Sequence, residues 1–290
     1  MTDEIPPNHV GAIDPATDEI VAAIPVGIRP GPVAAGGGSV WVGNLQDRNL
    51  TRIDPLERSA VAAVSLGDRT PTGLAVGAGA VWVAHGLRGE LSRVEPQFGQ
   101  VTRTIAVTAR SPSGSAAVGA GYVWVVYGDS TLARIQPTPV RLSGSALIGP
   151  IPTAVAVSAG SVWVVNSGDA TVQRFNPTTF EEGAIRTISV GARPAGIAYG
   201  ERALWVANRG DDTVTRIDPS THATVDIRVG DEPVGVDVGA GAVWVANSGD
   251  GTVSRIDPAT NEVVRTIGVG NAPVGIAVAY GFVWVAAQAP

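Results

Sequence analysis

The chain has 290 residues, a formal net charge of −6 and 44% apolar residues, which is enough for one large domain with a sizeable core. It contains no cysteine, so disulfides, thiolate catalysis and cysteine metal sites are excluded. No apolar run reaches the roughly 18 residues that a membrane helix needs, and the negative charge argues against nucleic acid as a partner.

In chain order, residues 1–8 are expected to form an N-terminal tail, and they show neither the basic start nor the apolar stretch of a secretion signal. Residues 9–27 contain two strand-like runs around a PAT turn. Four strand-like runs then repeat, which we name A to D, and residues 271–288 add one A run and one B run. Gly or Pro interrupts nearly every ten residues and no helical period is present, so an all-β fold is expected.

The tryptophans establish the repeat, because each of them lies in a B run with text such as SVWVGN or AVWVAN. The seven tryptophans are spaced by 39 to 42 residues: Trp41, Trp82, Trp124, Trp163, Trp205, Trp244 and Trp284. This period is typical of a four-stranded propeller blade. The sequence therefore predicts a single domain, residues 1–290, that forms a seven-bladed β-propeller of four-stranded antiparallel blades. Residues 9–27 and 271–288 should pair as the closing blade, because a closed ring leaves only short, protected sheet edges.

The repeated unit "VWVAN…GDGTVSRIDPATNEVV…IGVGNAPVGIAV" resembles the YVTN β-propeller repeat of bacteria and archaea, over essentially all residues from His9 to Gln288. A more distant resemblance is to the seven-bladed streptogramin lyases. The family resemblance implies a surface or extracytoplasmic protein, or a propeller module of a larger signalling or transport protein.

Comparison of the seven copies separates scaffold from candidate site. The A–B and C–D turns have nearly the same sequence in each copy, and they share one face, here called the bottom face. Six C runs carry an arginine at one position, which we interpret as stacking on tryptophan or pairing with turn carboxylates. The aspartates of the SGD-type turns are explained by short Asx turns without a metal. These features are Arg52, Arg93, Arg134, Arg174, Arg216 and Arg255, and Asp129, Asp169, Asp211 and Asp250.

The D–A linkers and B–C turns share the opposite face, here called the top face, and there the copies differ. Loops on a rigid scaffold often carry function, so this face is the best binding candidate. Four B runs end in asparagine, where two others have His85 and Tyr127. The linkers place four arginines on one arc and two acids on another, which suggests an anion-binding mouth, although a solvated loop face explains them equally well. These residues are Arg29, Arg69, Arg110 and Arg193, and Asp231 and Glu232.

Asp237 occupies an A-run position that is alanine in the other copies. A lone carboxylate near the axis is costly unless it is paired or hydrated. It is therefore either paired with an arginine or channel water, or it contacts a ligand in the channel, and it completes the list of binding candidates.

Catalysis finds little support in the sequence. The three histidines, His9, His85 and His222, are not expected to meet, and no spacing suggests a zinc site. We therefore expect no cofactor or metal, and a binding, sensor or scaffold propeller that recognises a protein, peptide or small polar ligand on its top face. It would be a monomer or a module of a larger protein. The alternatives are a lyase-like or lactonase-like enzyme, which a metal bound by His85 and an acid would favour, and a purely structural spacer.

Overall fold

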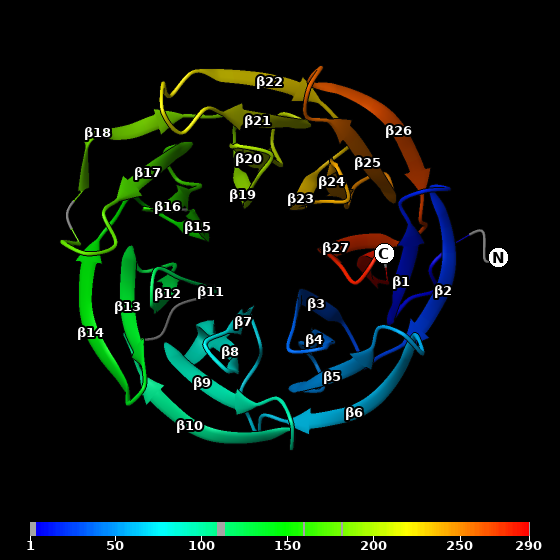
Figure 1. Ribbon diagram of the computed structural model, residues 1–290, viewed down its shortest axis with the longest axis horizontal. Coiled ribbons are helices and arrows are strands. Elements are labelled where there is room, and N and C mark those ends of the chain that lie inside the picture. Colours follow the sequence, from blue (N-terminus) through cyan, green and yellow to red (C-terminus); the bar gives the residue numbers. More distant parts are fainter. Residues whose placement is uncertain (1–3, 109–113, 159, 181, 290) are drawn as a thin grey trace.

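The computed structural model describes residues 4–108, 114–158, 160–180 and 182–289. Seven four-stranded antiparallel sheets stand around a central axis as the blades of a propeller (Figure 1). Blades 1 to 6 are consecutive in the chain, and blade 7 combines both ends. The fold predicted from the sequence is confirmed.

In each blade, strand A lies nearest the axis and strand D lies at the rim (Figure 1). The A strands of blades 1 to 7 are β3 (Pro30–Gly36), β7 (Gly73–Gly77), β11 (Gly114–Gly119), β15 (Pro152–Ser158), β19 (Pro194–Gly200), β23 (Pro233–Gly239) and β27 (Ala272–Ala279). The B strands are β4 (Ser39–Asn44), β8 (Ala80–His85), β12 (Tyr122–Tyr127), β16 (Ser161–Asn166), β20 (Ala203–Asn208), β24 (Ala242–Asn247) and β28 (Phe282–Gln288).

The C strands, again from blade 1 to blade 7, are β5 (Asn49–Asp54), β9 (Glu90–Glu95), β13 (Thr131–Pro137), β17 (Thr171–Phe175), β21 (Thr213–Ile217), β25 (Thr252–Asp257) and β1 (His9–Asp14). The D strands are β6 (Ser59–Ser65), β10 (Gln100–Ala106), β14 (Val140–Leu147), β18 (Glu182–Ser189), β22 (Thr224–Arg228), β26 (Glu262–Gly268) and β2 (Glu19–Pro25). The sequence predicted no helix, and the described residues contain one, the single 3₁₀ turn η1 (Gly86–Arg88). No helix in this part of the chain has the length and apolar character needed to cross a membrane.

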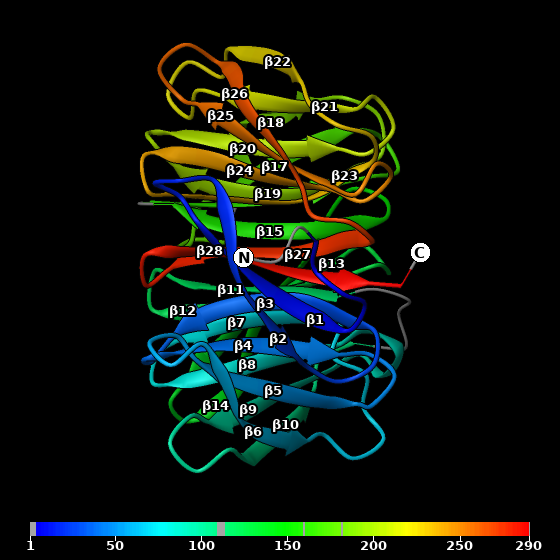
Figure 2. The same cartoon turned by 90° about the vertical axis from the view of Figure 1, so that its right-hand side faces the viewer.

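Blade 7 closes the ring as the sequence predicts. Strand β1 pairs antiparallel with β28, so that Val10 faces Ala286 and Ala12 faces Trp284. The first two and the last two strands of the chain therefore belong to the same sheet, which faces the viewer in Figure 2. The closing contact extends into the predicted tail, because the Ile5 side chain is fully buried and its backbone N–H donates to Val269 O at 2.7 Å.

The core consists of seven apolar layers, each between two neighbouring blades. Every tryptophan is fully buried, as predicted, and packs against the B strand of the next blade. Trp163, for example, packs against Leu204 and Val206 of blade 5. The predicted stacking of C-strand arginines on these rings is confirmed in four blades, with guanidinium carbons 5.2 to 5.7 Å from the ring centroid: Arg52, Arg174, Arg216 and Arg255.

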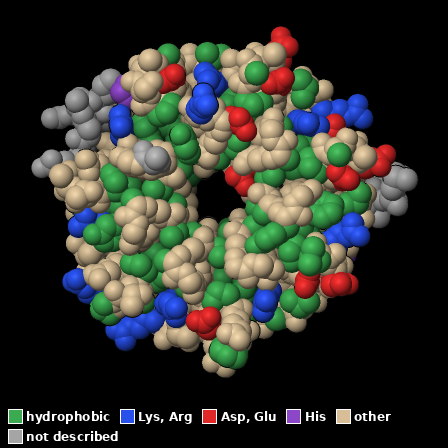
Figure 3. Space-filling view, in the orientation of Figure 1, with side chains coloured by type: hydrophobic (Ala, Val, Ile, Leu, Met, Phe, Trp, Pro, Cys, Tyr) green, Lys and Arg blue, Asp and Glu red, His purple; other side chains and the backbone are tan. Residues whose placement is uncertain are grey.

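Small residues in the A strands allow the blades to converge on the axis. A Cβ atom on Gly73 would lie 2.7 Å from Gly114 O of the next blade, and one on Gly196 would lie 2.7 Å from Val234 O. Only glycine permits such a close approach of backbones. An axial opening remains at the centre and is visible in Figure 3, which looks onto the bottom face.

Candidate functional site

Three adjoining hollows lie on the top face, two of them between blades 1 and 2 and the third on the axis. One of about 390 Å³ is lined by Arg48, Thr70, His85 and Leu87, among others. A second of about 430 Å³ shares Arg48, Thr70 and Leu87 with the first and adds Arg29. A third of about 400 Å³ is the mouth of the axial channel, and it shares Leu45 and Thr72 with the second. We call the first two together the top groove. It leads from His85 to the axis.

The groove lies where blade 2 departs from the repeat. The linker from Gly67 to Ala75 is one residue longer than the equivalent linker from Gly27 to Ala34. The turn after β8 forms η1 and carries Arg88 where the equivalent turn of blade 1 carries Asp47. The longer linker and the altered turn form one wall of the groove, and the linker and turn of blade 1 form the other.

In four other blades the same region is a fixed brace rather than a site. The asparagine that ends the B strand is fully buried, and its Nδ2 donates to two side chains of strand C. In blade 5, for instance, Asn208 Nδ2 lies 3.0 Å from Thr213 Oγ1 and 2.8 Å from Thr215 Oγ1. These asparagines therefore lie below the top face, and they hold strands B and C together: Asn44, Asn166, Asn208 and Asn247.

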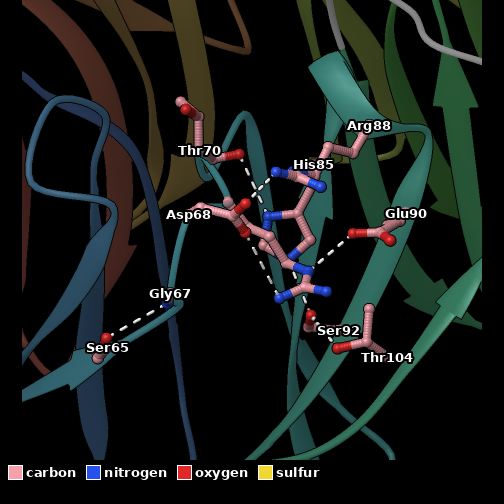
Figure 4. A network of polar contacts seen from close by, with 10 residues as sticks. Ser65, Gly67, Asp68, Thr70, His85, Arg88, Glu90, Ser92 and Thr104 are labelled. Carbon is pink, nitrogen blue, oxygen red and sulfur yellow. Dashed lines mark hydrogen bonds and ion pairs between the residues drawn. The ribbon is translucent and has the colours of Figure 1, made fainter.

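The turn aspartates also form hydrogen bonds to the neighbouring D–A linkers. The Asx turns expected from the sequence, which are local to the turn, do not include these bonds. Asp211 Oδ2 accepts the backbone N–H of Ala192 at 2.6 Å, and Asp250 Oδ2 accepts that of Asp231 at 3.0 Å. Each carboxylate thus joins a B–C turn to the preceding D–A linker. In blade 2 the roles of donor and acceptor are reversed. Arg88 of the turn donates to the carboxylate of Asp68 in the linker (Figure 4).

His85 replaces the asparagine brace in blade 2 (Figure 4). It is 1% exposed, its Nδ1 lies 3.2 Å from Thr70 O, and its Nε2 lies 2.8 Å from Ser92 Oγ. Because a carbonyl oxygen only accepts, we assign the ring proton to Nδ1, so that Nε2 accepts from the Ser92 hydroxyl. Burial lowers the pKa of His85 to about 4, and the imidazole is neutral at neutral pH. Both ring nitrogens are occupied within the protein.

We expect His85→Asn to reduce the acid sensitivity of folding. A histidine whose folded pKa is about 4 resists protonation, whereas the unfolded chain takes up the proton near pH 6.5. Stability from this residue is therefore fully present above pH 6.5 and is lost as the pH falls toward 4. Between pH 7 and pH 4.5 the loss is about 2–3 kcal/mol. Urea unfolding at both pH values measures it, and equal pH dependence of the native protein and the variant would contradict the assignment.

Ion pairs occupy several of the charges that the sequence places on this face. Arg69 Nε lies 2.7 Å from Glu90 Oε2, and Asp68 is bound by Arg88. Across the ring, Arg209 Nη2 lies 2.6 Å from Glu232 Oε2. Two candidates, Arg69 and Glu232, therefore already have partners of opposite charge.

Arg29 and Arg48 differ from these residues. Both side chains are exposed, and neither forms an ion pair within the described parts of the chain. Both line the second hollow, and Arg48 also lines the first. The groove thus contains two guanidinium groups that are available to an anion. Sequence reasoning missed Arg48, although the altered length of the neighbouring linker pointed to this region.

The remaining linker candidates lie elsewhere on the top face. Arg193 and Asp231 are exposed, and no ion pair engages either within the described ranges. They belong to the linkers that precede blades 5 and 6, so neither lines the top groove. Arg110 lies outside the described residues.

Tyr127 and Asp237 join neighbouring blades. Tyr127 is fully buried and its Oη donates to Glu90 O at 2.6 Å, and burial raises its pKa. Asp237 Oδ2 accepts the N–H of Val278 in blade 7 at 2.7 Å, and Oδ1 accepts the N–H of Val238 at 2.9 Å. Burial raises the pKa of Asp237 as well. Backbone N–H groups, rather than an arginine, are thus the polar partners of this carboxylate in the structure.

The other two histidines lie far from His85 in the fold. His9 opens β1, and its Nδ1 lies 2.9 Å from Pro7 O. His222 follows β21 in a C–D turn on the bottom face, with its ring centroid 6.4 Å from that of Trp163. In the described ranges, no three His, Cys, Asp or Glu side chains are grouped as metal ligands would be.

Comparison with known proteins adds family and fold information. Residues 130–233 match the model of the YNCE-like beta-propeller family. No curated protein gives a significant match to the sequence. Among solved structures, a streptogramin B lyase is similar with a TM-score of 0.79 and 13% identity, over 96% of this chain and 94% of that chain.

Two further structures have the same architecture. Hydrazine synthase of Kuenenia stuttgartiensis has a TM-score of 0.78 and 13% identity, over 89% of this chain and 92% of that chain. Virginiamycin B lyase of Staphylococcus aureus has a TM-score of 0.74 and 17% identity, over 89% and 91%. At these identities the likeness concerns the fold. The chain is a seven-bladed β-propeller that matches the YNCE-like family in its middle blades and resembles the streptogramin B lyase in overall architecture.

Proposed function

We propose that this propeller is a non-catalytic binding module whose ligand occupies the top groove. The observation that carries the proposal is that the irregular segments of blade 2 lie at the two hollows of the top groove. The extra linker residue and η1 in blade 2, which both depart from the repeat, lie in the walls of two adjoining hollows. A purely structural spacer has no need for hollows of this kind.

The chemistry of the groove favours binding over catalysis. His85 is neutral and both of its nitrogens are held by Thr70 and Ser92, so it is poorly placed to exchange a proton with a ligand. Glu90 is bound to Arg69, which keeps its charge occupied. The groups that remain free to contact a ligand are the guanidinium groups of Arg29 and Arg48, the Thr70 hydroxyl and the exposed side chain of Leu87.

Crystals soaked separately in isopropanol and in acetate test the location of the site. Both probes are small enough to reach the surface of the linker in every blade, and we expect them to bind in the top groove. In crystals of Leu87→Trp the larger side chain should fill the groove and remove them. Leu56→Trp serves as a control, because Leu56 is 84% exposed in a C–D turn on the bottom face. Probes spread evenly over the linkers of all blades would favour the structural spacer.

A further inference from the structure

From the charge and shape of the top groove we infer the class of ligand that it accepts: a monocarboxylate joined to an apolar group. This inference rests on the proposed function and makes it more specific. The shared chemistry could come from a free aliphatic or aromatic acid, or from the C-terminal residue of a peptide.

The charges that line the groove leave an excess of positive charge. Three arginines face two carboxylates along its walls, namely Arg29, Arg48 and Arg88 against Asp68 and Glu90. Arg88 is held by Asp68, and Glu90 is held by Arg69. Arg29 and Arg48 therefore supply the uncompensated charge, on a protein whose net charge is −6. A guanidinium donates two parallel hydrogen bonds to a carboxylate, which suits this role.

A single negative charge fits the groove better than a double one. A dianion bound by Arg48 would lie close to Asp47, which is next to Arg48 in the chain and forms no ion pair within the described ranges. The Asp47 carboxylate is fixed nearby, because its Oδ2 accepts the N–H of Ile28 at 2.8 Å. Repulsion from like charges increases with the charge of the ligand. A carboxylate is therefore favoured over a phosphate.

Apolar surface continues from the arginines toward the axis. Leu87 is 58% exposed and lines both hollows of the groove, while Leu45 and Thr72 lie where the second hollow meets the channel mouth. The walls of the channel mouth include Val33 and Leu74. A ligand with its carboxylate at Arg48 can thus place an apolar chain over Leu87 and Leu45. The Thr70 hydroxyl, which has no hydrogen-bond partner among the described residues, can contact a second ligand oxygen.

Calorimetric titration with four probes tests the inference on the full chain. Octanoate carries both features, acetate only the charge, octanamide only the apolar chain, and octyl phosphate a double charge. We expect octanoate to bind at least about tenfold more tightly than each of the others, as expected when a charge-assisted contact and apolar burial are combined. A peptide that ends in leucine, compared with its C-terminal amide, tests the peptide source. Binding of the free peptide acid alone would assign the site to chain ends.

Variants separate this inference from the proposed function. Arg48→Ala should weaken octanoate binding about tenfold, and Arg48→Lys should weaken it less because the charge remains. Arg202→Ala is the matched control, since Arg202 is exposed on the bottom face and has φ 60°, close to the 54° of Arg48. If octanamide or octyl phosphate binds in the groove as tightly as octanoate, the ligand class is wrong and the binding function stands. If no probe binds there, both are overturned.

Discussion

Deletion of residues 1–27 is expected to abolish cooperative unfolding and to make the protein aggregate. These residues provide strands C and D of blade 7, and their loss exposes the edge of β28 from Val283 to Ala287. An exposed, apolar strand edge pairs readily with other chains. The effect should be visible as a broad unfolding transition and as large species in light scattering.

The energy involved is comparable with the stability of the whole domain. Four aliphatic side chains of this segment that are larger than alanine are at most 2% exposed: Ile5, Val10, Ile13 and Ile24. Burial of each is worth about 1.5–3 kcal/mol, so together they contribute roughly 6–12 kcal/mol. Total stabilities are typically about 5–15 kcal/mol. Removal of the segment therefore leaves little net stability even before the hydrogen bonds between β1 and β28 are considered.

A shorter deletion is the control for this experiment. Removal of residues 1–4 leaves Ile5 and all of β1 in place, and we expect the melting temperature to change little. A synthetic peptide of residues 5–27 added to the long deletion should restore a cooperative transition, because blade closure involves no covalent bond. A monomeric long deletion with an unchanged melting temperature would show that blade 7 does not close the ring.

The fold could be predicted because the same information occurs seven times. A tryptophan every 39 to 42 residues fixes strand B of each blade, and the incomplete first and last units fix the closure. The role of Ile5 was missed, since a single isoleucine in a polar stretch gives no periodic signal. Its burial depends on Gly11, where a Cβ atom would clash with the Ile5 side chain.

The candidate site was harder to predict, because it depends on side-chain pairing between turns. The sequence identifies the turns that share the top face, but it does not show that Arg69 bonds to Glu90, 21 residues away. It also gives no means to distinguish a ligand contact from a brace at the end of strand B. Tyr127 occupies the position of the asparagine brace and is buried in the same way. The extra residue in the linker of blade 2 was readable from the copies, but the linker of blade 3 is one residue longer still, so length alone did not single out Arg48 and Thr70.

Replacement of Trp163 by alanine is expected to cost about 3–5 kcal/mol of unfolding free energy, the usual range for emptying a large core site. Trp163 is fully buried between blades 4 and 5, where it packs against Leu204, Val206 and Ile217. Its Nε1 donates to Ser158 Oγ at 3.0 Å. The guanidinium of Arg174 lies 5.2 Å from the ring centroid, so the variant also removes a cation–π contact.

Urea denaturation followed by far-ultraviolet circular dichroism measures this loss, because the signal comes from all blades and does not depend on the deleted ring. Leu147→Ala is the control, since Leu147 is 86% exposed on the outer strand β14 and should change the unfolding free energy by less than about 0.5 kcal/mol. Trp163→Phe should fall between the two, because a smaller ring keeps part of the packing but has no indole N–H for Ser158. A loss below about 1 kcal/mol in Trp163→Ala would mean that the buried tryptophans do not stabilise the packing between neighbouring blades. The packing described for all seven layers would then be wrong.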